Sequence, residues 1–202
     1  MIKTIKKDVE AEIVVKKSKF ISHIYYIESE EEAKNIINQT SKKYYDAKHN
    51  CYAYVVQEKS AIIERSSDNG EPNGTAGAPL CNVIKKNNLC NILIIVTRYF
   101  GGILLGTGGL VKAYTDSALK ALEEAEICNK ELGNKYEIEI EYDKLKTFKY
   151  ICNKLDIKRT NIEYLQNINI TIETTKEKFE KLVEDKGALL NYKLIEENIW
   201  IG

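Results

Sequence analysis

The 202-residue sequence is poor in proline, tryptophan and methionine, and it has no excess charge of either sign. Thirty lysines and arginines match 30 aspartates and glutamates, which argues against a strongly basic nucleic-acid-binding module. The longest uninterrupted apolar run, Cys51 to Val56, is far shorter than the roughly 20 residues that a membrane helix needs. We therefore expect a soluble protein that resides in the cytoplasm and has no membrane partner.

Metal-binding and disulfide patterns are also missing. The five cysteines form no Cys-x-x-Cys pair, and their odd number fits neither a disulfide framework nor a zinc site. The two histidines, His23 and His49, have no second ligand at the usual metal spacing. We expect reduced thiols, no metal and no cofactor.

Glycine and proline, by contrast, are concentrated in one part of the chain. Eight of the 11 glycines and both prolines fall between Gly70 and Gly109. A glycine inside a helix or strand costs about 0.5 to 1 kcal/mol relative to alanine, so such a cluster indicates tight turns or a closely approaching ligand. We expect the segments 66–79 and 98–112 to meet in one concave functional site.

The hydrophobic pattern predicts an α+β protein of two domains, residues 1–130 and 134–202. In the first domain, apolar runs predict strands at 13–15, 20–27, 51–56 and 92–96. Helices are predicted after the capping box Ser29–Glu32, around Pro79, and from Leu110 onward. The second domain shows the order β-α-β-β-α-β, which is typical of a ferredoxin-like fold.

The glycine-rich turn before the third helix matches no complete phosphate-binding motif. The dinucleotide fingerprint would need a glycine where Val111 stands, and no Gly-Lys-Ser/Thr follows as in a P-loop. The turn nevertheless leads into a helix that we expect to begin near Gly108, and free N–H groups at a helix N-terminus form a ready anion site. A tight turn with nothing bound is the alternative.

Arg98 is one of only three arginines, and it directly follows the apolar run 92–96. A guanidinium at a strand end is suited to binding phosphate or carboxylate, and an internal pair with Asp68 or Glu71 is the alternative. Together with the Arg98 guanidinium, the aromatic rings of Tyr99 and Phe100 would form a platform on which RNA bases stack. The alternative is that these rings are buried in the core, as aromatic residues at such a turn often are. The full set of candidate anion- or RNA-binding residues is Gly74, Thr75, Gly77, Arg98, Tyr99, Phe100, Gly101, Gly102, Gly106, Gly108, Gly109 and Lys112.

Three further side chains are candidates for acid/base chemistry. Asp68 and Glu71 lie in a turn-forming loop, where carboxylates carry protons or simply cap backbone groups. His49 precedes an expected strand and is the third candidate. The sequence shows no complete catalytic constellation, so binding is favoured over catalysis.

The segments Ser67–Gly77 and Val96–Tyr114 together resemble the double signature of the YigZ/IMPACT family, and residues 17–21 and 47–54 also fit it. The resemblance implies a first domain with the fold shared by the second domain of a small-subunit ribosomal protein and by domain four of elongation factor G. It implies a second domain similar to the last domain of that factor. Eukaryotic relatives regulate translation by competing for the ribosome-associated activator of a stress-sensing kinase.

The chain departs from the family pattern at three positions: Asn69 replaces an aspartate, Ala78 a basic residue, and Lys112 an arginine. Two hypotheses about function follow. The first is a translation-associated regulatory or binding protein that contacts RNA, the ribosome or a translation factor through the glycine-rich turn. The second is an enzyme or binder acting on a phosphorylated small molecule, with Glu71 and His49 as proton carriers.

Overall fold

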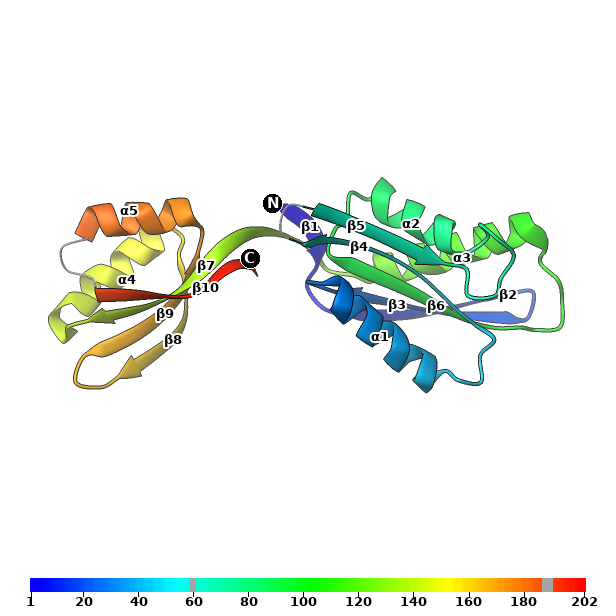
Figure 1. The fold of residues 1–202 in the computed structure, drawn as a ribbon, viewed down its shortest axis with the longest axis horizontal. Coiled ribbons are helices and arrows are strands. Elements are labelled where there is room, and N and C mark those ends of the chain that lie inside the picture. Colours follow the sequence, from blue (N-terminus) through cyan, green and yellow to red (C-terminus); the bar gives the residue numbers. More distant parts are fainter. Residues whose placement is uncertain (59–60, 187–190) are drawn as a thin grey trace. The chain divides into compact units, whose positions relative to one another are not determined.

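The computed structural model describes residues 1–58, 61–186 and 191–202, and it divides into two compact units (Figure 1). One unit comprises Ile2–Asn129, and the other comprises Lys130–Gly202 together with Met1. Each unit has its own sheet with helices packed on it, which confirms the α+β class.

The first unit is built on an antiparallel sheet in the order β2-β3-β6-β4-β5. Its strands are β2 (Val9–Val15), β3 (Ser18–Tyr26), β4 (His49–Glu58), β5 (Ala61–Ser67) and β6 (Ile92–Tyr99). A short strand, β1 (Ile2–Ile5), pairs with β7. The central strand β6 is buried along almost its whole length, as its run of branched apolar residues predicts.

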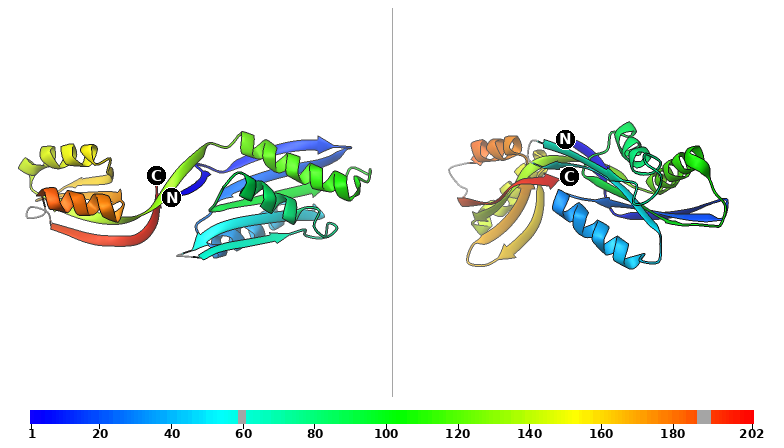
Figure 2. Two further views of the ribbon diagram at one scale, coloured as in Figure 1. Left: turned by 90° about the horizontal axis from the view of Figure 1, so that it is seen from above. Right: turned by 45° about the vertical axis from the view of Figure 1, so that its right-hand side comes forward.

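Helices cover both faces of this sheet. Helices α2 (Gly77–Lys86) and α3 (Gly106–Glu123) lie on one face, and α1 (Glu30–Lys43) lies on the other (Figures 1 and 2). Because side chains alternate along a strand, Ile94 and Val96 pack toward α2 and α3, whereas Leu93 and Ile95 pack toward α1. The same alternation places Arg98 and His49 on the α2/α3 face.

The second unit has the predicted β-α-β-β-α-β order. Its elements are β7 (Ile127–Ile140), the short 3₁₀ helix η1 (Tyr142–Lys144), α4 (Leu145–Lys154), β8 (Lys158–Tyr164), β9 (Ile168–Thr174), α5 (Lys176–Lys186) and β10 (Asn191–Ile201). The antiparallel strand order β10-β7-β9-β8 confirms the ferredoxin-like arrangement. Strand β7 begins in the first unit and runs through residues 129–134 without a break, so no separate linker loop stands there.

Candidate functional site

The two glycine-rich segments meet in the first unit, where they form a cleft of about 430 Å³. The walls come from the start of β4, the loop before α2, the end of β6 and the loop that leads into α3. The lining residues are Lys48, His49, Glu71, Pro72, Arg98, Phe100, Leu104, Leu105, Gly106, Thr107 and Leu110. The cleft thus combines a largely apolar wall with three buried or half-buried polar side chains, those of His49, Glu71 and Arg98.

Glu71 and Arg98 form a buried ion pair in this wall. Arg98 Nη1 donates to Glu71 Oε1 at 2.6 Å, and both side chains are more than nine-tenths buried. The internal pair considered from the sequence is therefore present, and its acceptor is Glu71 rather than Asp68. Arg98 also donates to the Ser18 hydroxyl at 3.4 Å, while its Nε has no hydrogen-bond partner among the described residues.

Tyr114 from α3 completes the shell around Glu71. Its hydroxyl donates to Glu71 Oε1 at 2.8 Å. Burial, reinforced by the Cys51 thiol and the Glu71 carboxylate, raises the pKa of Tyr114 far above its ordinary value, so the phenol stays protonated as a donor. In the sequence, Tyr114 is only the last residue of the signature segment Val96–Tyr114, and nothing there signalled this polar contact.

Cys51 lies behind this cluster and is a structural thiol. Its Sγ is 2.9 Å from the Asp68 carbonyl oxygen, which can only accept, and 3.3 Å from the Tyr114 hydroxyl. Burial raises the pKa of Cys51 to about 12. The thiol is therefore protonated and unreactive near neutral pH.

His49 is held in a defined orientation at the edge of the cleft. Its Nδ1 lies 2.9 Å from the carbonyl oxygen of Asn69, so Nδ1 carries the hydrogen. Its Nε2 then lies 4.0 Å from Glu71 Oε1, on the side of the cleft. Asn69 supports this arrangement because its Oδ1 accepts from the Asn50 amide at 2.8 Å, as the usual aspartate could also do.

Asp68 caps the loop and the N-terminus of α2. Its two carboxylate oxygens accept from the backbone amides of Gly74, Ala76 and Gly77 at 2.8 to 2.9 Å. Partial burial alone would raise the pKa of Asp68, but these three amides outweigh it and hold the pKa below its ordinary value. Asp68 does not line the cleft, and the structure thus gives this carboxylate a capping role instead of the proposed proton transfer.

The same contacts correct the expectation for Gly74, Thr75 and Gly77. The amides of Gly74 and Gly77 are bonded to Asp68, and both the amide and the hydroxyl of Thr75 donate to the Pro72 carbonyl oxygen. This loop therefore has no free donor at these three positions for an anion. Gly77 is required by packing, because a Cβ there would lie 2.9 Å from the backbone of Ser67.

The aromatic platform expected from Tyr99 and Phe100 is not formed. Tyr99 points to the other face of the sheet and donates from its hydroxyl to Asp46 at 2.8 Å. Phe100 is half exposed and lines the cleft with the Arg98 guanidinium carbon 5.6 Å from its ring centre. Lys112 does not line the cleft, and its ammonium pairs with Asp116 on the exposed side of α3.

The glycines of the second segment serve different purposes. A Cβ on Gly101 would lie 2.0 Å from the Lys17 carbonyl carbon, so this glycine permits a close backbone contact. Gly102 and Gly106 have φ angles of +84° and +72°, which favour glycine. Gly108 has neither constraint: open space surrounds the position of its Cβ, and its φ is not positive.

The N-terminus of α3 opens toward the cleft. The helix begins at Gly106, earlier than expected, and its N-cap residue Leu105 makes no side-chain capping bond. Its first turn contains no acidic residue, and no described residue accepts a hydrogen bond from the amides of Gly106, Thr107 or Gly108. These are the free donors that the sequence predicted for this turn.

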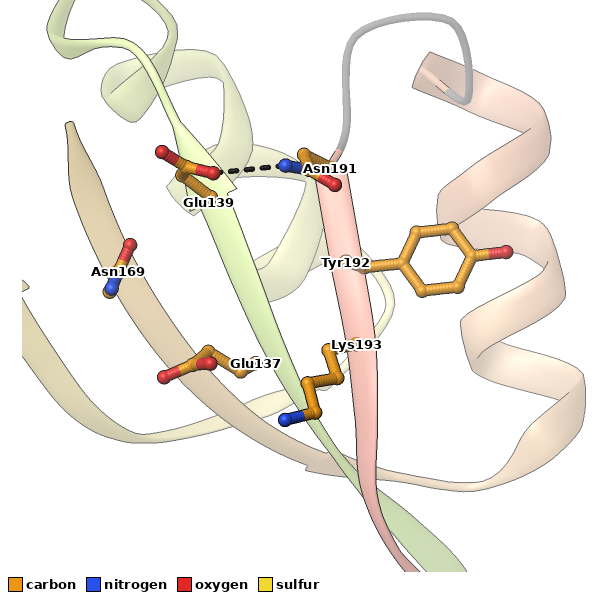
Figure 3. Close-up of a pocket in the computed structure, with 6 residues that line it drawn as sticks. All are labelled: Glu137, Glu139, Asn169, Asn191, Tyr192 and Lys193. Carbon is orange, nitrogen blue, oxygen red and sulfur yellow. Dashed lines mark hydrogen bonds between the residues drawn. The ribbon is translucent and has the colours of Figure 1, made fainter.

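A second hollow, of about 240 Å³, lies on the open face of the second unit's sheet (Figure 3). Glu139 accepts from Asn191 at 2.9 Å and from Asn167 at 2.8 Å. Tyr192 points away from the other labelled side chains and packs edge-on against Phe179 of α5. Among the labelled residues, the one aromatic ring, that of Tyr192, therefore does not face the acidic and amide groups of this hollow.

Within the described ranges, no group of three or more histidine, cysteine, aspartate or glutamate side chains is arranged to hold a metal ion. None of the helices in those ranges is both long and apolar enough to cross a membrane.

Comparisons with known proteins point to the same family as the two signature segments that form this cleft. The family model described as the Impact N-terminal domain matches residues 16–122. The IMPACT family member YvyE of Bacillus subtilis is 36% identical over 91% of this chain and 80% of its own length. An IMPACT family member of Haemophilus influenzae is 32% identical over 90% of this chain and 91% of its own length.

A solved structure described as that of a hypothetical protein covers 97% of this chain and 98% of its own, with 30% identity and a TM-score of 0.62. The two-unit fold is therefore shared along the whole chain. Since the family model covers more than half of the sequence and the bacterial relatives align over nearly all of it, this chain belongs to the IMPACT family.

Proposed function

We propose that the protein is a translation-associated regulator that binds RNA, the ribosome or a translation factor through the loop 100–105 and the first turn of α3. The observation that carries this proposal is an apolar loop beside unpaired helix amides. Phe100, Ile103 and Leu104 are 49%, 42% and 83% exposed, although each is a large apolar side chain. Exposed apolar groups gathered around donors for phosphate or carbonyl oxygen are typical of a docking surface.

Family membership supports the same proposal. Regulation of translation by eukaryotic members of the family is what the resemblance described above brings to this chain, and the signature segment Val96–Tyr114 contains this loop. The neutral overall charge favours a local, shape-dependent contact over tight nonspecific binding to RNA.

Ribosome co-sedimentation and filter binding with RNA at low salt test the proposal. Leu104→Asp places a carboxylate at the most exposed apolar position of the loop and should weaken association at least about tenfold, because binding would then desolvate a charge. The matched control is Leu165→Asp, since Leu165 is 60% exposed in a loop of the other unit. Wild-type protein that retains neither ribosomes nor RNA, or two variants with equal losses, would contradict this function.

His49 favours a second candidate function, the enzyme or binder acting on a phosphorylated small molecule. Its fixed Nδ1 contact leaves Nε2 facing the cleft, the orientation a general base requires. If the protein is such an enzyme, the Glu71→Gln variant, assayed under conditions where it is shown to be folded, should lose turnover while its affinity for ligand changes little. Screening phosphorylated metabolites for turnover separates this candidate from the first.

A further inference from the structure

We propose that the cleft of the first unit binds a 5′-phosphorylated nucleoside, either as a free nucleotide or as the phosphorylated 5′ end of an RNA. This inference rests on the proposed function, since it names the chemical group that the RNA-contacting surface would hold. Three parts of the cleft match the three parts of such a ligand.

The phosphate matches the N-terminus of α3. Gly106, Thr107 and Gly108 present unpaired amides at the positive end of an 18-residue helix whose first turn contains no carboxylate. An independent observation points to an anion in the same cleft: Arg98 is 6% exposed, lines the cleft, and keeps its Nε without a partner in the described part of the chain. A buried N–H with no acceptor is destabilising and rare, and an anionic oxygen in the cleft would supply the missing acceptor.

The charges around the cleft sum in favour of an anion. Glu71 is the one carboxylate in its lining, and its Oε1 is already bonded to Arg98 and Tyr114. Lys48 is exposed, lines the same cleft and adds a second positive charge. The helix dipole adds a further positive potential at the amides of α3.

The sugar and base match the remaining walls. Glu71 and the Nε2 of His49 can accept hydrogen bonds from ribose hydroxyls, a role that carboxylates have in other nucleotide sites. Phe100 lines the cleft and is 49% exposed, so a base can stack on the exposed part of its ring, and Pro72 and Leu104 provide further apolar surface. A volume of about 430 Å³ lies in the range of small-ligand pockets.

Titrations of the full chain, followed by amide NMR shifts, test the site with inorganic phosphate, adenosine and 5′-AMP. We expect 5′-AMP to shift the amides of Gly106, Thr107 and Gly108 and to bind more tightly than phosphate, with adenosine the weakest. An RNA 10-mer with a 5′-phosphate, compared with the same RNA carrying a 5′-hydroxyl, identifies the source. Binding of 5′-AMP supports a free nucleotide, and selective binding of the phosphorylated RNA supports an RNA end.

Two substitutions at one exposed position provide the matched control. Thr107→Asp places a negative charge where the phosphate would lie and should weaken binding at least about tenfold. Thr107→Asn introduces a side chain of nearly the same shape as aspartate but without the charge, and its affinity should stay within about threefold of the wild-type value. An aspartate in the first turn also stabilises the helix, so lost binding would not reflect unfolding.

The inference is overturned if neither 5′-AMP nor phosphorylated RNA shifts these amides, if phosphate binds as tightly as 5′-AMP, or if both Thr107 variants lose affinity equally. Its failure is distinguishable from that of the proposed function. Ribosome association that persists without nucleotide binding would refute only the nucleotide site. Nucleotide binding without ribosome, RNA or factor association would refute only the translation role.

Discussion

The carboxylate of Glu71 and the guanidinium of Arg98 are joined at 2.6 Å in a wall of the cleft where both are almost fully buried. Two segments far apart in the sequence are thereby fixed to each other. A buried pair is a weak source of net stability, but removing one partner leaves an uncompensated charge. Arg98 is thus a structural residue as well as a candidate ligand contact, and its removal perturbs the fold as well as binding.

We therefore predict strong coupling between these two residues. Arg98→Met and Glu71→Gln should each lower the free energy of unfolding by about 3 to 5 kcal/mol, because each leaves a buried charge without its counter-charge. The double variant should lose clearly less than the sum of the two. Urea unfolding of the four proteins measures the coupling, and additive losses would show that the pair is not energetically linked.

A second prediction concerns the cap at Asp68. Asp68→Ala should lower the free energy of unfolding by about 2 kcal/mol, since the amides of Gly74, Ala76 and Gly77 lose their acceptors. Asp68→Asn keeps one carbonyl oxygen and should lose less.

The pH dependence of this loss has a defined sign. Because the folded-state pKa of Asp68 is depressed, its stabilising contribution is complete above the unfolded-state value of about 4 and disappears as the pH falls through the folded value. The difference in unfolding free energy between wild type and Asp68→Asn should accordingly shrink between pH 7 and pH 3. A difference that grows on acidification would contradict the assignment.

Much of the fold could be predicted because local signals and tertiary packing agree. The runs at 51–56 and 92–96 lie within buried strands, and the predicted cap is present because Ser29 Oγ accepts from the Glu32 amide at 3.0 Å. Strand β5 was not predicted, since it is an edge strand in which no residue is fully buried. Helix α3 was placed too late because its first turn contains Gly106, Gly108 and Gly109, which are poor helix formers.

For the site, the sequence predicted which two segments meet, but it did not predict the contacts of the individual side chains. The density of turn residues indicated that two segments meet, but the direction of each side chain depends on backbone details that spacing does not encode. Asp68 turned toward the α2 amides and Glu71 toward Arg98, although both carboxylates lie in the same loop. Tyr114 could not be recognised, because its position on an apolar helix face is equally that of an ordinary core residue.

A third prediction separates two glycines that look alike in the sequence. A Cβ on Gly133 would lie 2.4 Å from Ile201 Cδ1 and 2.7 Å from the Thr174 carbonyl oxygen, so this glycine within β7 is required by packing. Gly133→Ala should lower the free energy of unfolding by about 1 to 3 kcal/mol. Gly108→Ala, where the space is open, should leave it unchanged or raise it by up to about 1 kcal/mol. Thermal unfolding of both variants checks the contrast, and equal effects would refute it.

A fourth prediction concerns the two units. Among the described residues, the buried clusters of the first unit end at Ala125, and the buried cluster of the second unit begins at Tyr136. We predict that residues 1–130 fold without the rest of the chain. Circular dichroism of this fragment should show a cooperative thermal transition, with the full chain as reference. An insoluble fragment, or one without a cooperative transition, would count against independent folding.

A last prediction concerns His23, a residue of β3 that is 3% exposed. Burial lowers its pKa, Lys43 adds to this, and Glu10, whose Oε2 lies 3.2 Å from Nδ1, acts in the opposite direction. The unfolded chain therefore binds a proton near pH 6.5 that the folded chain does not yet bind. Stability should be constant above that pH and fall below it, with a limiting slope of about 1.4 kcal/mol per pH unit from this group.

Two variants isolate the contribution of His23. Urea unfolding between pH 7.5 and 5 should show a shallower pH dependence for His23→Gln than for wild type, since the titrating group is gone. Glu10→Gln should steepen it or extend it to lower pH, because the group that favours protonated His23 in the folded state has been removed. Identical profiles for all three proteins would mean that another group governs the acid sensitivity, and the folded-state pKa of His23 would then be close to its unfolded value.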